Sequence, residues 1–152
     1  MCDMSQRIGI KHRDAFRKSA TALKTEFDRN VAVQRLLLRF TQAIITQMAQ
    51  TAACNRYHRL EQQLCCWLLA CMDCLPSGNS LQVTHETVVS LLGVRREGVT
   101  DATGTLHRLS LISGSRGKIS ILDRGGLHAR ACECYQVVRR ETDRLLPNRP
   151  AN

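Results

Sequence analysis

Apolar positions recur at helical spacing over most of this chain. From Val31 to Tyr57 there is no proline or glycine, and a seam of positions recurs at intervals that alternate between four and three residues. The seam is apolar at first and polar toward its end, and it consists of Val33, Leu37, Phe40, Ile44, Gln47 and Thr51. Such spacing is typical of a long helix that packs against another helix. The partner of residues 31–57 is therefore either the rest of the domain or a second copy of the chain.

A shorter helix is predicted on each side of this long one. Over residues 15–29, Ser19 is suited to cap the helix N-terminus, and Leu23 and Phe27 lie four residues apart on one face. Over residues 59–75, leucines recur on one face together with Trp67, which we expect in the core. The Pro-Ser-Gly-Asn segment that follows ends this helix.

The middle of the chain predicts a helix-turn-helix. Residues 80–83 alternate apolar and polar side chains, as a short strand does. Thr84 is a good N-cap for a helix that reaches Leu92, and Gly93 suits the left-handed backbone at a helix end. A second helix follows after about three residues, and its inner face holds Val99, Ala102, Leu106 and Leu109. Two short helices joined around a glycine are the helix-turn-helix pattern.

A small hairpin and one last helix complete the pattern. Residues 111–113 and 118–122 are predicted as strands, and the Gly-Ser-Arg-Gly turn between them makes a basic tip. Asp123 is suited to cap a final helix that runs to about Leu146 and is ended by Pro147. The predicted fold class is mainly α with a small β-hairpin wing, in which a long helix precedes a winged helix-turn-helix domain.

Composition and charge narrow the class of protein. The 152 residues suit about one domain, and 43% hydrophobic residues are enough to form a core. The formal charge of +9 points to a polyanionic partner, either nucleic acid or an anionic membrane surface. No apolar run reaches the roughly 18 residues of a membrane helix, and the N-terminus lacks a secretory signal. We therefore expect a cytoplasmic protein without membrane contact, whose eight cysteines are reduced.

Residues around the second helix of the helix-turn-helix have the chemistry for reading DNA. A helix fits the major groove of B-DNA, and its N-terminal side chains reach base edges. Arg95 and Arg96 can bond both acceptors of a guanine, and Glu97 can accept from a cytosine amino group. The candidates for binding phosphate are Thr84, Thr100, Arg108, Arg116 and Lys118. The sequence thus predicts a module that binds double-stranded DNA.

Two motifs resemble the DNA-binding half of bacterial transcription regulators of the Crp/Fnr family. They are VRRE at 94–97 and RGKISILDR at 116–124, within a similarity that runs from about Phe16 to Tyr135. The resemblance implies that the long helix is the interface of a homodimer and that Arg96 and Glu97 read bases. Where well-known members have a further basic base-reading residue, this chain has Asp101, so we expect its operator to differ at that position.

The resemblance also implies a domain organisation. Residues 1–30 would be the end of a sensor domain with its short helix, 31–57 the dimerisation helix, 58–146 the winged helix-turn-helix domain and 147–152 a tail. Only about 30 residues precede the dimerisation helix, so we expect most of the sensor domain to be missing. No cofactor is predicted, and control by a cyclic nucleotide is not expected. The expected partners are double-stranded DNA, a second copy of the chain and RNA polymerase.

Cysteine chemistry is the main alternative to DNA binding. Cys71-x-x-Cys74 and Cys132-x-Cys134 could supply four thiolates to zinc or an iron–sulfur cluster, as in a metal or redox sensor. Both pairs lie in predicted helices, which favours a role as small buried hydrophobes, so we predict no metal site. A third alternative is an interaction protein that dimerises through residues 31–57 and binds DNA weakly.

The motifs of known enzyme classes are incomplete or absent in this sequence. His85-Glu86 begins like a zincin helix, but the position required for the second histidine holds Val89. The Gly114–Lys118 segment is too short for a phosphate-binding loop, and there is no Gly-x-Ser-x-Gly elbow. We therefore expect a protein that is not an enzyme.

Overall fold

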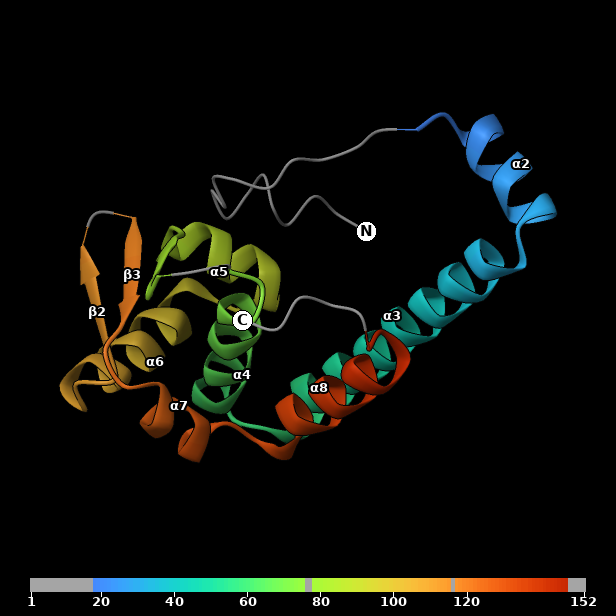
Figure 1. The fold of residues 1–152 in the computed structure, drawn as a ribbon. Coiled ribbons are helices and arrows are strands. Elements are labelled where there is room, and N and C mark those ends of the chain that lie inside the picture. Colours follow the sequence, from blue (N-terminus) through green and yellow to red (C-terminus); the bar gives the residue numbers. More distant parts are fainter. Residues whose placement is uncertain (1–17, 76–77, 116, 148–152) are drawn as a thin grey trace.

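The computed structural model describes residues 18–75, 78–115 and 117–147, and it is mainly helical with one small sheet (Figure 1). The elements in chain order are α2 (Ala20–Arg29), α3 (Val31–Tyr57), α4 (Leu60–Met72), β1 (Ser80–Gln82), α5 (His85–Leu92), α6 (Arg96–Arg108), β2 (Ile112–Ser115), β3 (Lys118–Ile121), α7 (Arg124–Arg130) and α8 (Glu133–Leu145). This arrangement confirms the predicted fold class. Residues 15–17 of the first predicted helix lie outside the described residues.

The N-terminal part of the long helix α3 extends away from the sheet and the helices around α4 (Figure 1). Its backbone is continuous because no glycine or proline interrupts it. At its start, the Asn30 side chain accepts hydrogen bonds from the N–H groups of Ala32 and Val33. The predicted cap of α2 is confirmed, since Ser19 Oγ accepts from the Ala22 N–H at 3.2 Å. Among the described residues, no helix is long and apolar enough to cross a membrane.

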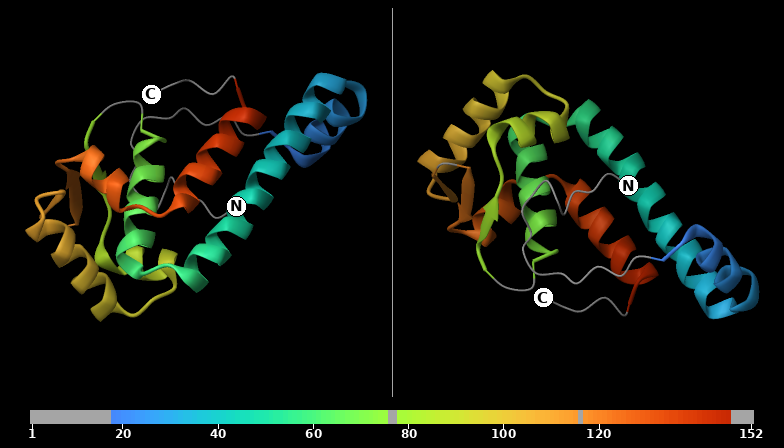
Figure 2. Two further views of the ribbon diagram at one scale, coloured as in Figure 1. Left: turned by 90° about the horizontal axis from the view of Figure 1, so that it is seen from below. Right: turned by 90° about the horizontal axis from the view of Figure 1, so that it is seen from above.

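The hydrophobic core surrounds α4, which lies between α6, α7 and the sheet (Figure 2). Leu64, Cys65, Leu68 and Leu69 on this helix are fully buried. Apolar side chains of α5, α6, α7 and the three strands close around them. Trp67 is half-buried and packs against this core, as predicted.

The sheet is antiparallel, with strand order β1-β3-β2. The predicted hairpin is confirmed as β2 and β3, and Gly117 at its turn has a φ of 81°. Leu81 of β1 pairs with Ile119 of β3, so the strand before the helix-turn-helix is joined to the wing. The inner faces of these strands supply buried leucine and isoleucine side chains to the core.

The single last helix predicted from Asp123 to Leu146 is wrong, because two helices occupy this segment. Asp123 does cap α7 by accepting from the Gly126 N–H at 2.9 Å. The chain then leaves the helix at Ala131 and Cys132, both of which are extended, with ψ angles of 147° and 168°. The break lets α7 pack against α4 while α8 lies along α3 (Figures 1 and 2). Because α7 packs its apolar face on α4 and α8 packs its own on α3, tertiary packing overrides the helical pattern of the sequence between them.

Candidate nucleic-acid interface

The turn between α5 and α6 is fixed by a cap on each side. Thr84 Oγ1 accepts a hydrogen bond from the Thr87 N–H at 3.2 Å, which caps the start of α5 as predicted. Gly93 ends α5 in the left-handed conformation, with φ 65° and ψ 32°. Arg95 is then the extended residue before α6. The two helices are thus joined by three residues, and the predicted helix-turn-helix is confirmed.

Helix α6 has one buried face and one exposed face. Three of the predicted inner residues, Val99, Ala102 and Leu106, are buried. The fourth, Leu109, is 43% exposed, which corrects the prediction. Leu109 caps the C-terminus of α6, and the chain turns there, so that Leu111 enters the core instead. Thr103 is also buried, and its hydroxyl donates to the Val99 carbonyl at 2.6 Å.

The four predicted base-reading residues all lie on the exposed face of this helix-turn-helix. Arg95, Arg96 and Glu97 are exposed where α6 begins, and Asp101 is exposed about one turn further on. Side chains at the N-terminus of such a helix are the ones that reach base edges in the major groove. In the described part of the chain these four side chains are therefore exposed to solvent.

Most of the predicted phosphate-binding residues are exposed in the described structure. The Thr100 hydroxyl donates to the Arg96 carbonyl at 3.0 Å, and one Arg108 nitrogen donates to Thr105 Oγ1 at 3.0 Å. Lys118 is exposed on the wing, whereas Arg116 lies outside the described residues. The Arg108 guanidinium and the Lys118 ammonium group keep further donors for a phosphate, whereas the single Thr100 hydroxyl hydrogen would have to leave the Arg96 carbonyl to reach one.

A hollow of about 470 Å³ separates α6 from the wing and the start of α5. Three predicted phosphate-binding residues line it, namely Thr84, Thr100 and Lys118. The Val83 N–H donates to the Gly117 carbonyl at 2.8 Å and holds the wing against the cap of α5. Arg108 and the base-reading residues lie outside this lining. The tertiary structure therefore gathers residues from three elements into one concave surface.

Two histidines of the same hollow were not predicted as site residues. His85 and His107 line it beside Gly104, whose missing side chain leaves space between α6 and the wing. His85 is the first residue of α5, directly after the predicted cap Thr84, and that position was the signal available in the sequence. An imidazole N–H in this place can donate to a phosphate oxygen.

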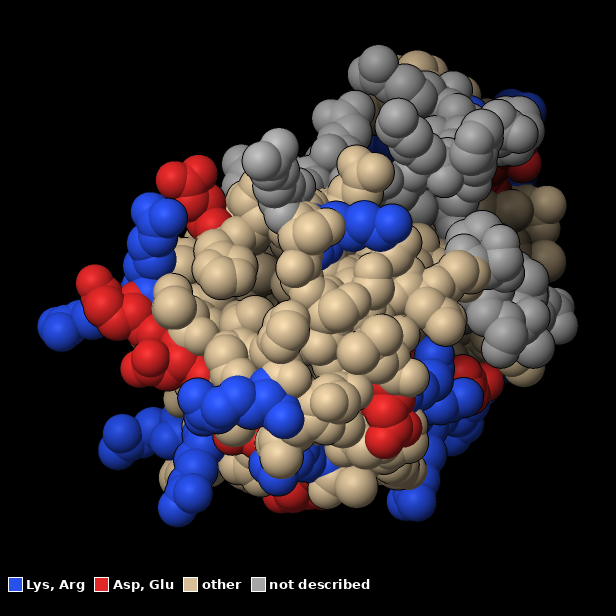
Figure 3. Space-filling model, turned by 90° about the vertical axis from the view of Figure 1, so that its left-hand side faces the viewer, with Lys and Arg blue, Asp and Glu red and all other residues tan. Residues whose placement is uncertain are grey.

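Charge on the side of the wing is mixed. Figure 3 shows this side, with Lys and Arg side chains around an uncharged central area and several Asp and Glu side chains among them. This side of the molecule therefore carries no uniform positive patch among the residues shown in colour. Placement of individual arginine and lysine side chains matters more than the total charge.

The cysteine pairs proposed as an alternative metal site do not come together. Cys71 lies in the core around α4, whereas Cys132 and Cys134 lie against Cys54 and Cys66. Burial raises the pKa of the Cys71 thiol to about 12, which fits the expected role of a small buried hydrophobe. Cys132 differs, because hydrogen bonds from neighbouring thiols outweigh burial and lower its pKa.

Comparison with known proteins identifies the helix-turn-helix. Residues 62–130 match the family model of the Crp-like helix-turn-helix domain. The chain is similar to a structure from Eubacterium rectale assigned to the Crp/Fnr transcriptional regulators, with a TM-score of 0.56 and 24% identity, covering 73% of this chain and 51% of that one. For a CRP-family transcriptional regulator from Thermus thermophilus, the TM-score is 0.53 and the identity 22%, covering 75% and 55%. This chain spans about half the length of those two proteins. No protein of curated function shows significant sequence similarity to it.

The matched segment contains the elements on which the sequence resemblance rests. It begins in α4, includes α5, α6 and the wing, and ends with α7 at Arg130. The two solved structures share the fold over about three-quarters of this chain. The chain therefore carries a Crp-like helix-turn-helix domain, as the sequence resemblance predicts.

Proposed function

We propose that this chain is a transcription regulator that binds double-stranded DNA sequence-specifically as a homodimer. The observation that carries the proposal is the start of α6, where the Arg96 and Glu97 side chains are exposed to solvent in a Crp-like helix-turn-helix domain. Arg96 would bond a guanine, and Glu97 would accept from a cytosine. Arg95 would assist Arg96 or bind a phosphate. Asp101 stands where well-known Crp/Fnr members have a further basic base-reading residue, so the operator would differ at the base pair that this residue faces.

Phosphate contacts would orient the domain on the duplex. The hollow beside the wing offers the Thr84 and Thr100 hydroxyls and the Lys118 ammonium group to one stretch of backbone. Arg108 at the far end of α6 would add a further contact, and so would Arg116, which lies outside the described residues. These contacts carry no sequence information, so they would support random and specific DNA alike.

Dimerisation is supported by apolar side chains that α3 leaves in solvent. The exposed ones are Val31, Leu36, Leu38, Phe40, Ile45, Met48 and Tyr57. Within the predicted seam, Phe40, Gln47 and Thr51 are exposed, and Val33, Leu37 and Ile44 are half-buried. Helix α8 covers a different face, which includes the buried Ala43 and Cys54. A second α3 packed along the seam would remove Phe40 and the half-buried Val33, Leu37 and Ile44 from water.

The dimer would read a palindromic operator. Two recognition helices related by a two-fold axis fit successive major grooves about 34 Å apart. Contact of the bound dimer with RNA polymerase would be the route to regulation, and it is part of the proposal.

Selection from a random DNA library, followed by titration of the selected site, tests the proposal. The purified chain should enrich a two-fold symmetric sequence and bind it at least about 1,000-fold more tightly than scrambled DNA at physiological salt. Affinity for both should fall as salt rises, because phosphate contacts release counterions. Equal affinity for selected and scrambled DNA would contradict sequence specificity. A stable dimer without measurable DNA binding would favour the interaction protein instead.

A further inference from the structure

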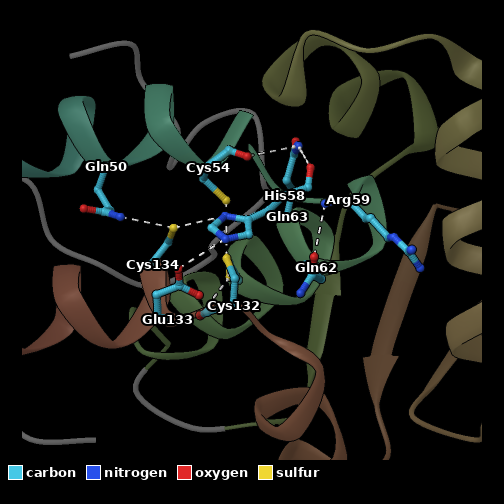
Figure 4. Close-up of polar contacts among 10 residues, drawn as sticks. Gln50, Cys54, His58, Arg59, Gln62, Gln63, Cys132, Glu133 and Cys134 are labelled. Carbon is cyan, nitrogen blue, oxygen red and sulfur yellow. Dashed lines mark hydrogen bonds and ion pairs between the residues drawn. The ribbon is translucent and has the colours of Figure 1, made fainter. Parts of the chain in front are cut away.

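Four metal-ligating side chains meet where α3 ends and α8 begins. We call them the Cys3His cluster, and its members are Cys54, His58, Cys132 and Cys134. The three cysteines are buried, and the His58 side chain is 19% exposed. Figure 4 shows the thiols and the imidazole pointing toward one another from the two helices. The cluster lies outside the helix-turn-helix and its DNA-reading residues.

Two of the six distances between ligand atoms of the Cys3His cluster are close to the edges of a tetrahedral zinc site. One potential ligand atom from each residue lies within 4.8 Å of all the others. The sulfur atoms of Cys54 and Cys132 are 3.5 Å apart, and the Cys134 sulfur is 3.4 Å from His58 Nδ1. Zinc bonds of about 2.3 Å to sulfur and 2.0–2.1 Å to nitrogen give tetrahedral edges of about 3.8 Å and 3.6 Å. The ligand atoms would therefore have to shift by about 1 Å or less to surround a zinc ion.

A second layer of hydrogen bonds orients these ligands. His58 Nε2 lies 3.3 Å from a Glu133 carboxylate oxygen, which would fix the ring with Nδ1 free to bind a metal. The Gln50 amide donates to the Cys134 sulfur at 3.1 Å. Gln63 is buried, and its amide donates to the backbone carbonyls of Cys54 and His58 at 3.4 and 2.9 Å. A ring nitrogen backed by a carboxylate is the usual surrounding of a zinc-bound histidine.

We propose that the Cys3His cluster is a binding site for one zinc ion per chain. Three thiolates and one neutral imidazole form a ligand set that zinc binds in structural sites. Each cysteine that is still a thiol would release its proton to solvent as the metal binds, and no electron transfer is involved. The bound ion would join the C-terminal end of α3 directly to the start of α8. It would thereby fix the junction between the long helix and the helix-turn-helix domain, contrary to the sequence-based prediction of no metal.

The same cysteines offer one competing chemistry, the formation of a disulfide. Cys132 Sγ lies 3.3 Å from Cys66 Sγ as well as 3.5 Å from Cys54 Sγ. His58 and its Glu133 partner favour metal binding, because a disulfide uses neither of them. The experiment therefore substitutes the cysteine ligands and, separately, Glu133, which pairs with His58.

Zinc binding is measured on the full chain, purified with a phosphine reductant, stripped of metal and titrated with zinc against a chromophoric chelator. We expect one zinc ion per chain and a rise in melting temperature on loading. Cobalt in place of zinc should give the visible absorption of tetrahedral cobalt with thiolate charge-transfer bands. Replacement of any one cluster cysteine by serine should weaken zinc binding at least about 100-fold, whereas Cys74→Ser should leave it unchanged. Binding that persists in all three cysteine variants would overturn the site.

Glu133→Gln keeps the test decisive if a cysteine variant does not fold. Glu133 is exposed, so its replacement should leave the metal-free melting temperature unchanged while zinc affinity falls about 10-fold. Glu141→Gln on the same helix is the matched control and should leave zinc affinity unchanged. Failure of the reduced wild-type chain to bind zinc would overturn the proposal. So would a chain that takes up no metal but forms a Cys54–Cys132 disulfide with oxidised glutathione. Neither result would touch the DNA-binding proposal, which rests on other residues.

Discussion

Two glycines of the recognition helix α6 have opposite surroundings. A Cβ added at Gly104 would meet no atom within 4 Å, whereas one at Gly98 would lie 2.8 Å from Leu60 Cδ2. Glycine inside a helix costs about 1 kcal/mol relative to alanine. Gly104→Ala should therefore stabilise the protein by up to about 1 kcal/mol, which raises the melting temperature by about 2–4 °C. Thermal unfolding followed by circular dichroism measures this change.

Gly98→Ala is the matched comparison on the same helix. Its methyl group would press on the half-buried Leu60, so the gain in helix propensity should be offset or reversed. An equal rise in melting temperature for both variants would show that Leu60 moves aside freely. A fall for Gly104→Ala would show that the space beside the wing is needed for packing.

Base reading and phosphate binding should separate in two single substitutions. Arg96→Ala removes a bidentate contact and should cost about 1–3 kcal/mol on the selected operator, with relaxed preference at one base pair. Lys118→Ala removes a phosphate contact and should weaken binding to all sequences alike. Fluorescence anisotropy on selected and scrambled duplexes measures both effects. If each variant lowered the affinity for the selected duplex and the affinity for the scrambled duplex by the same factor, the proposed division into base-reading and phosphate-binding roles would be wrong.

At the scale of elements, the exposed face of α3 should hold the dimer together. Phe40→Asp places a charge on the predicted seam and should raise the dimer dissociation constant about 100-fold, equivalent to about 3 kcal/mol for a buried unpaired charge. Gln82→Asp introduces the same charge at an exposed position of β1, away from α3, and should leave the dimer intact. Sedimentation velocity measures the oligomeric state of both. A monomeric wild-type chain, or equal dissociation of the Phe40→Asp and Gln82→Asp dimers, would contradict the role of the seam.

A buried tyrosine joins α8 to the end of α4. The Tyr135 hydroxyl donates to an Asp73 carboxylate oxygen at 2.8 Å and accepts from Arg139 at 3.1 Å. Tyr135→Phe should lower the free energy of unfolding by about 1–2 kcal/mol, because a hydrogen bond to a charged group is lost. Tyr57→Phe is the control, since Tyr57 is 80% exposed on α3. Urea denaturation measures both, and equal values would show that the buried hydroxyl contributes nothing.

At the scale of the whole molecule, dimer geometry should set the operator spacing. A rigid dimer that places two α6 helices about 34 Å apart requires half-sites about one helical turn apart. Inserting five base pairs between the half-sites turns one of them to the opposite side of the duplex. Affinity should then fall to the level of a single half-site, as measured by anisotropy. Unchanged affinity for the altered operator would show that the two domains bind independently.

Local patterns predicted most individual elements correctly because their causes are local. The cap residues Ser19, Thr84 and Asp123 accept the hydrogen bonds expected of them. Gly93 has the left-handed backbone expected from its place after α5. Leu109 was placed wrongly, because the spacing of α6 continues to this residue although the helix ends there. Helix ends of this kind depend on where the following segment packs.

The sequence by itself determined the helices, the turn with its arginines and the hairpin, since caps, glycine and periodicity act over a few residues. Only the tertiary structure decided where the C-terminal helix breaks and which face of α3 it covers. It also decided which cysteines meet. The sequence offered Cys71 and Cys74 as partners of Cys132 only as an alternative to DNA binding, whereas α8 brings Cys132 to Cys54, 78 residues away in the chain. Such contacts depend on how whole apolar faces pack, which no local spacing specifies.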